Sequence, residues 1–240
     1  MGIRAPYKYR QNIRQAFNHF FNYLIIYDIQ NPFLKVKGFR RLNERKKEML
    51  FWTEDEFQQF IKVVNNLTYK ALFSLLYLTG CRKGEALSLH WSDLRGSTVI
   101  IDKTLSAKTL SKEYKETTPK TENSYRKVDI PDSLVSLLKE LKKESTGDFI
   151  FGGSSLLPFQ TVTNNFERYI KLAGVKMIRV HDLRHSHASF LINHGDNQLS
   201  TLYIIAKRIG DTPEQILKTY GHLFPNKQGS ILEALNIPLS

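Results

Sequence analysis

Hydrophobic residues recur at helical spacing along most of the chain. In Tyr7–Tyr27 the apolar side chains fall on one face, which predicts a helix that Asn31-Pro32 stops. Thr53 to Glu56 reads as a capping box that opens a helix to about Asn65. Further helices are predicted at Tyr69–Thr79, ended by Gly80, and at Lys83–Leu89, Asp132–Lys143, Gln160–Leu172, His181–Asn193, Gln198–Arg208, Pro213–Thr219 and Gly229–Leu235.

Two segments change to the period-two pattern of strands. Thr98–Ile101 and Tyr125–Ile130 alternate or run apolar, and a polar Lys/Thr-rich ribbon lies between them. The predicted fold class is therefore mostly α with a small antiparallel β-sheet, an α+β arrangement.

Charge is unevenly distributed along the 240 residues. Residues 1–50 carry 11 basic and 3 acidic side chains, a net +8, whereas residues 51–240 carry 24 and 20, a net +4. The segment Lys35–Lys47 is rich in Lys and Arg and reads either as a solvated linker or as one that follows a phosphate backbone. A polyanionic partner, nucleic acid or an anionic membrane surface, fits this pattern.

Several classes of protein do not fit the sequence. The longest apolar runs, such as that around Leu24 to Ile26, are too short to cross a bilayer, and no signal peptide pattern opens the chain. The single cysteine, Cys81, excludes an internal disulfide and a cysteine-based zinc cluster. A reducing cytoplasm fits these observations.

Arg82 and Lys120 are candidates for binding an anion. Arg82 stands between Gly80 and a predicted helix, where the helix dipole disfavours a cation unless an anion is bound there. Glu85, three residues on, can orient the guanidinium, although an ordinary surface ion pair has the same spacing. Lys120 lies in a polar turn that enters a strand, where it is either solvated or a mobile cation and proton donor.

His181, Arg184 and His185 are predicted to share one helical face. His-x-x-x-His with an acidic second residue invites a zinc interpretation. The acid is Asp182, shorter than the usual glutamate, and Arg184 between the histidines would repel a dication. No obvious third ligand follows, although His194 and His222 exist, so zinc is disfavoured.

Tyr220 ends a short helical pattern beside Gly221 and His222, which predicts that it is mobile and exposed. Asp211 follows the glycine of the preceding segment, Arg208-Ile209-Gly210-Asp211.

Together and in this order, these segments resemble the tyrosine recombinase (phage integrase) family over about Phe51 to Leu235. The resemblance rests on Thr-Gly-x-Arg-x-x-Glu at Arg82, a hairpin lysine at Lys120, His-x-Leu-Arg-His at His181–His185 and Tyr-x-His at Tyr220. The tail from Tyr220 to Pro225 also looks like integrases of phages and conjugative elements of Gram-positive bacteria.

The resemblance implies phosphoryl transfer on DNA without a cofactor or metal. Tyr220 would attack a backbone phosphate and form a 3′-phosphotyrosyl bond, while Arg82 and Arg184 stabilise the charge of the transition state. Lys120 would protonate the leaving 5′-oxygen. His181 would bind the phosphate or help to accept the tyrosine proton, with Glu85, His185 and His222 in support.

The sequence departs from the family pattern at Asp211, where the family usually has His or Trp. A carboxylate facing a phosphate is repulsive, so we expect Asp211 to orient a cation such as an active-site arginine or His222. The second departure is length, because these integrases carry DNA-binding domains before the catalytic one.

We therefore expect residues 1–34 to be the end of a helical core-binding domain, 35–50 a basic linker and 51–240 the catalytic domain of a C-terminal fragment. The partners that the resemblance implies are double-stranded DNA at attachment core sites, other protomers in a synaptic tetramer and accessory DNA-bending proteins. It implies no membrane partner, and it implies a location in the bacterial cytoplasm. The 229–235 helix would pack on a neighbouring protomer. A catalytically inactive DNA-binding regulator and a type IB topoisomerase-like enzyme are the alternatives. The linker residues expected to bind DNA are Arg40, Arg41, Arg45, Lys46 and Lys47.

Overall fold

The computed structural model describes residues 7–24, 27, 29–35, 49–107, 114–117, 125–195 and 198–224. The chain divides into two units, residues 1–48 and residues 49–240. The second unit therefore begins two residues before the predicted start of the catalytic domain. Lys120, the 36–48 part of the basic linker and the predicted helix at 229–235 lie outside the described residues.

The first unit contains the helix α1, Tyr7–Leu24, and the 3-10 turn η2, Pro32–Lys35. The helix had been predicted to reach Tyr27, and its described part ends at Leu24. The buried Asn31 side chain donates a hydrogen bond to Asn22 Oδ1 at 3.1 Å, which ties the turn to the helix.

The second unit is mainly helical, as predicted, and every predicted helix among the described residues is present within a few residues of its expected bounds. The capping box at Thr53 is confirmed, because Thr53 Oγ1 accepts from Glu56 N and Glu56 Oε2 accepts from Thr53 N. The helices are α2 (Glu54–Val63), α3 (Leu67–Thr79), α4 (Lys83–Leu87), α5 (Asp132–Glu144), α6 (Phe159–Ala173), α7 (Asp182–His194), α8 (Gln198–Ile209) and α9 (Pro213–Tyr220), with the 3-10 turns η3 (Trp91–Asp93) and η5 (Gly221–Leu223).

Two helices begin at residues other than those predicted, and capping explains the first case. Asn66 accepts a hydrogen bond from Tyr69 N at 3.1 Å, so α3 begins two residues before the predicted Tyr69. His181 had been predicted as the first helical residue, and it instead occupies the N-cap position of α7.

Within the described residues, five strands form two antiparallel sheets. The three-stranded sheet has the order β1-β2-β5, with β1 at Leu94–Arg95, β2 at Thr98–Ile101 and β5 at Arg126–Asp129. The polar ribbon between the predicted strands holds a further pair, β3 (Thr104–Ala107) and β4 (Tyr114–Thr117), which was not predicted. The predicted fold class, mostly α with a small antiparallel sheet, is confirmed.

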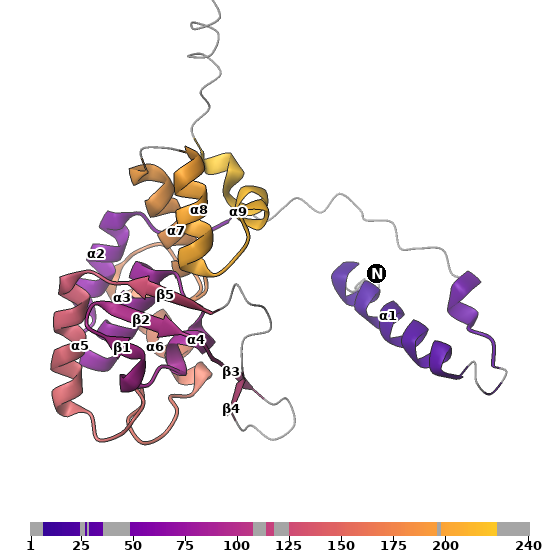
Figure 1. The fold of residues 1–240 in the computed structure, drawn as a ribbon, viewed down its shortest axis with the longest axis horizontal. Helices are drawn as coiled ribbons and strands as arrows, with labels where there is room; N and C mark the ends of the chain where they lie inside the picture. The colour runs from indigo at the N-terminus through magenta and orange to yellow at the C-terminus, as the bar shows by residue number, and fades with distance from the viewer. Residues whose placement is uncertain are drawn as a thin grey trace, which may run out of the picture. The chain divides into compact units, whose positions relative to one another are not determined.

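The β3–β4 pair leaves the body next to α4 (Figure 1). Gly84 permits this contact, because a Cβ at that position would lie 2.7 Å from the Leu105 carbonyl oxygen. The β3–β4 pair is therefore anchored at α4, the helix that follows Arg82.

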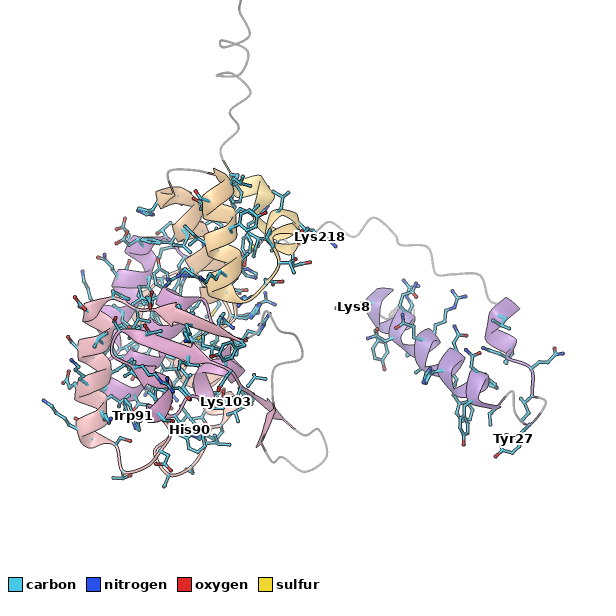
Figure 2. All side chains as sticks on the ribbon, viewed as in Figure 1. Lys8, Tyr27, His90, Trp91, Lys103 and Lys218 are labelled. Carbon is cyan, nitrogen blue, oxygen red and sulfur yellow. The ribbon has the colours of Figure 1, made fainter. Side chains whose placement is uncertain are left out.

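Two apolar clusters support the second unit. The larger one surrounds Trp52, Phe60, Phe73 and Phe166, and the smaller one joins α7, α8 and α9. These three helices lie together at one end of the body (Figure 1). Figure 2 shows the exposed Lys218 of α9 at this end, with His90, Trp91 and Lys103 at the opposite end.

No helix among the described residues is long and apolar enough to cross a membrane.

Candidate active site

The corner between α3 and α4 positions Arg82. Gly80 ends α3 in the left-handed conformation, at φ 65°, and Arg82 is the N-cap residue of α4. Glu85 accepts a hydrogen bond from Arg82 N and another from Arg82 Nη1, both at 2.8 Å. The predicted contact in which Glu85 orients the Arg82 guanidinium is present. The Arg82 side chain is 41% exposed, so its other face is open to a ligand.

Glu85 also binds Arg126, a contact that the sequence analysis missed. Arg126 Nη2 lies 2.7 Å from Glu85 Oε2, and both side chains are buried. Burial acts to raise the pKa of Glu85, but the charges and hydrogen bonds of Arg126 and Arg82 outweigh it and the pKa lies below its usual value. The alternation of β5 could have indicated this contact. It places Arg126 on the same buried face as Val128, and a buried arginine needs a partner.

Arg184 fastens α7 to the ends of two other helices. Its Nη1 donates to the carbonyl oxygens of Gly80, at 2.9 Å, and Ile209, at 2.5 Å. Burial lowers the pKa of Arg184 to about 10, and the charge of Arg82 adds to this effect. The pKa of His181 is lowered by burial, then by Arg184, with a smaller contribution from Arg82. The charges of Arg82 and Arg184 therefore act on each other and on His181.

Tyr220 is buried, with 3% of its surface exposed, so the prediction that it is exposed is wrong. On α9 it lies one turn after Ile216, and both side chains enter the apolar cluster of α7, α8 and α9. The i, i+4 spacing of Ile216 and Tyr220 was the signal for this burial. Burial raises the pKa of Tyr220 to about 12, although the charge of Arg184 opposes the shift.

The group in contact with the Tyr220 hydroxyl is His185, not the His181 of the sequence analysis. His185 Nδ1 lies 2.7 Å from Tyr220 Oη. The His185 ring also contacts the His181 ring edge to face, with 5.3 Å between the ring centroids. The hydrogen-bonding role of His185 could not be read from sequence, because 35 residues separate it from Tyr220.

Asp211 faces Arg184 rather than His222. Asp211 Oδ2 lies 3.5 Å from Arg184 Nη2, at the long limit of a hydrogen bond, and Oδ1 accepts from Thr212 N at 3.1 Å. His222 is exposed on η5. Of the predicted site, Lys120 and the five linker residues Arg40, Arg41, Arg45, Lys46 and Lys47 lie outside the described residues.

The site therefore lies where α7, α8 and α9 meet the corner between α3 and α4. It contains two arginines, two histidines, a shared carboxylate and a phenol. Guanidinium groups bind phosphate oxygens, and a phenol beside an imidazole can become a nucleophile. Among the residues that the structure describes, no group of three or more His, Cys, Asp or Glu side chains could hold a metal ion.

A mainly helical unit with this set of side chains fits the tyrosine recombinase (phage integrase) class. The chain belongs to the phage integrase family, since residues 51–226 match the family described as "Phage integrase family". The family assignment made from the four sequence segments is confirmed.

Two relatives and one solved structure illustrate the similarity. The chain is 32% identical to the ICEBs1 integrase of Bacillus subtilis (strain 168) over 223 residues, 86% of this chain and 59% of that protein. It is 28% identical to a tyrosine recombinase XerC-like protein of Caldanaerobacter subterraneus subsp. tengcongensis over 216 residues, 79% of this chain and 54% of that protein. The chain therefore spans between half and three fifths of the length of these relatives.

The fold is shared with the Tn1549 transposon integrase, solved in complex with transposon right end DNA. The TM-score is 0.74 at 20% identity, over 97% of this chain and 80% of that one. At this identity the similarity concerns the fold.

Proposed function

We propose that this chain is the catalytic part of a site-specific recombinase that cuts and rejoins DNA through a 3′-phosphotyrosyl bond to Tyr220, and so integrates or excises a mobile element. One observation carries the proposal. The Tyr220 hydroxyl lies 2.7 Å from an imidazole and interacts electrostatically with Arg184, in a unit of the phage integrase family.

The proposed chemistry assigns a task to each group. Tyr220 attacks the phosphate, and Arg82 and Arg184 stabilise the negative charge on its oxygens, each worth about 10²–10³ in rate. His181 binds the same phosphate, and Asp211 orients Arg184. Lys120 protonates the leaving 5′-oxygen. In this scheme no cofactor takes part, because the phosphotyrosyl bond retains the energy of the phosphodiester.

The proposed partner is double-stranded DNA at attachment core sites, where protomers meet in a synaptic tetramer and accessory DNA-bending proteins assist. The similarity in fold to an integrase solved with transposon end DNA supports a DNA partner. In this proposal residues 1–34 end a core-binding domain, 35–50 link it to the catalytic domain at 51–240, and the protein acts on DNA in the bacterial cytoplasm.

The test uses a pool of nicked duplexes in which the core positions are randomised. A nick beside the scissile phosphate lets the cut fragment diffuse away, so a covalent protein–DNA adduct accumulates. We expect the wild-type chain to form an adduct that survives SDS, because the bond is covalent, and Tyr220→Phe to form none. Tyr203→Phe, at an exposed tyrosine, is the matched control and should retain wild-type yield.

Two other outcomes would replace the proposal. If the wild-type chain binds DNA and forms no adduct with any member of the pool, the chain is a DNA-binding regulator. If it relaxes supercoiled DNA without site preference, it acts as a type IB topoisomerase.

A further inference from the structure

One imidazole lies between a hydroxyl and a carboxylate. The imidazole is that of His185, the hydroxyl belongs to Tyr220 and the carboxylate to Asp182. Tyr220 Oη lies 2.7 Å from His185 Nδ1, and His185 Nε2 lies 3.9 Å from Asp182 Oδ1. The second distance is too long for a direct hydrogen bond but short for a charge interaction. Asp182 thus favours the tautomer with its proton on Nε2, which leaves the Nδ1 lone pair facing the Tyr220 hydroxyl.

Asp182 is held in place by Arg179. Its fully buried carboxylate accepts from Arg179 N at 2.8 Å, Nε at 3.0 Å and Nη2 at 2.7 Å. It also lies in the first turn of α7, where the helix dipole stabilises negative charge. Burial acts to raise the pKa of Asp182, but the Arg179 hydrogen bonds outweigh it and the pKa lies below its usual value. The carboxylate is therefore ionised at neutral pH.

The surroundings of His185 keep its imidazole neutral. Burial and the nearby His181 lower the pKa of His185 to about 4, Arg184 and Arg179 act in the same direction, and Asp182 alone of these neighbours opposes them. From α9 the group that faces it is the Tyr220 hydroxyl. A neutral imidazole with a free lone pair can accept a proton, and the buried phenol needs a base to ionise.

We propose that His185 is the catalytic base that takes the Tyr220 proton, and that Asp182 and Arg179 are positioning residues that hold its tautomer and stabilise the imidazolium. This inference rests on the proposed function and deepens it. It transfers the proton-accepting task from His181 to His185 and leaves His181 to bind the phosphate. The arrangement follows the general logic of a nucleophile, its base and a group that orients the base.

The step balances as follows. The Tyr220 O–H bond breaks and its proton moves to His185 Nδ1, while the Tyr220 oxygen forms a bond to phosphorus. The bond from phosphorus to the 5′-oxygen breaks, and that oxygen keeps the electron pair and takes a proton from the acid, Lys120 in the proposed function. Rejoining reverses each transfer, so His185 returns the proton to Tyr220.

The first test measures the single-turnover rate of adduct formation on nicked duplexes selected with the wild-type chain. Loss of a general base removes about 10²–10⁴ in rate, so we expect His185→Ala and the similarly sized His185→Gln to fall in that range near neutral pH. Their rates should rise with pH as hydroxide ionises the phenol. His194→Ala, at an exposed histidine of the same helix, is the control and should retain the wild-type rate and pH profile.

The second test lowers the pKa of the nucleophile itself. With 3,5-difluorotyrosine at position 220 the phenol ionises more readily, so the His185→Gln chain should recover rate while the wild-type histidine chain gains little. Equal effects in both backgrounds would overturn the assignment. So would recovery of His185→Gln on a substrate with a 5′-bridging sulfur, because a thiolate leaving group replaces a missing acid and not a missing base.

The third test examines the positioning role of Asp182 through the rate and its pH profile. Asp182→Asn keeps the volume and removes the charge, so the rate should fall and its pH profile should shift while DNA affinity stays unchanged. An unchanged rate and profile would overturn the role of Asp182. Absence of any Tyr220-dependent adduct in the wild-type chain would contradict the proposed function itself, whereas a wild-type rate and pH profile in His185→Gln would overturn only the inference about His185.

Discussion

At the scale of single residues, one carboxylate connects three parts of the site. Glu85 accepts hydrogen bonds from the backbone and the guanidinium of Arg82 and from the guanidinium of Arg126. Arg126 Nε in turn donates to the Arg208 carbonyl oxygen at 2.8 Å, near the end of α8. The position of Arg82 therefore depends on a residue of β5 that touches no substrate in the proposed reaction.

Arg126→Met tests this dependence. Removing one partner of a buried ion pair costs about 3–5 kcal/mol, so we expect a loss of that order in the free energy of unfolding, measured with urea, and a slower adduct formation. Adding Glu85→Gln should restore most of the stability, because no buried charge is left over, but not the rate, since Arg82 loses its support. Lys127→Met, on the exposed face of β5, is the control. Recovery of both quantities in the double variant would contradict this account.

Local contacts within the site could be predicted and distant ones could not. The Arg82–Glu85 pair is separated by three residues, so helix geometry alone places the two side chains together. The contacts of Arg126 with Glu85 and of His185 with Tyr220 join residues 41 and 35 positions apart. Such contacts depend on how elements pack. The sequence indicated only that Arg126 and Tyr220 lie on the buried faces of their strand and helix.

At the scale of elements, a buried histidine joins α7, α8 and α3. Arg208 Nε donates to His187 Nε2 at 3.2 Å, and Arg208 Nη2 donates to the Leu78 carbonyl oxygen at 3.0 Å. His187 also hydrogen-bonds the backbone of Tyr77. His187 can accept from Arg208 only while it is neutral, and burial lowers the pKa of His187 to about 3.

This pKa predicts how stability depends on pH. The unfolded chain protonates a histidine near its ordinary pKa of 6.5, whereas folded His187 stays neutral down to about 3. The unfolded state therefore binds more protons between these values, and stability is full above the upper one and falls as pH decreases. We expect a loss on the order of 2 kcal/mol from His187 between its ordinary pKa and pH ~5, since one pKa unit is about 1.4 kcal/mol.

The measurement compares urea unfolding across that pH range for the wild-type chain and His187→Gln. Glutamine has no titrating group and its amide oxygen can still accept from Arg208, so the variant should show the shallower dependence on pH. Equal slopes in the two proteins would contradict the assignment of the effect to His187.

Elements with strong periodic patterns were predictable, whereas the β3–β4 pair was not. The capping box at Thr53 and the glycine at position 80 marked helix ends correctly, because capping is a local interaction. The strands β3 and β4 have polar sequences without a clear alternation, and β3 contacts α4 through a close approach at Gly84. A contact of this kind does not change the hydrophobic pattern of the strand, so the pattern could not predict it.

At the scale of the whole molecule, charge is concentrated outside the catalytic unit. Residues 1–50 carry a net +8, and the residues that follow carry +4 although they are almost four times as many. Each phosphate contact that a protein makes releases condensed counterions, so binding weakens with salt in proportion to the number of contacts. The basic linker should therefore set the salt dependence of DNA binding more than the site does.

Replacing Arg40, Arg41, Arg45, Lys46 and Lys47 with glutamine tests this proposal. If each contacts one phosphate, the slope of log affinity against log salt concentration should become less steep by about 4.5. Fluorescence anisotropy with a short duplex measures it. Glutamine at Lys139, Lys142 and Lys143 of α5 is the control, and an equal change of slope in that variant would show a nonspecific effect of net charge.

The burial of Tyr220 has a consequence for chemical labelling and for inhibitors. Tyr9, Tyr23 and Tyr203 are exposed and available to small electrophiles in solution, whereas Tyr220 is shielded by the packing of α9 against α7 and α8. Reagents that modify phenols should react with the surface tyrosines and spare Tyr220, the proposed nucleophile. A covalent inhibitor aimed at Tyr220 must therefore first displace it from His185, which makes the opening of α9 the event to target.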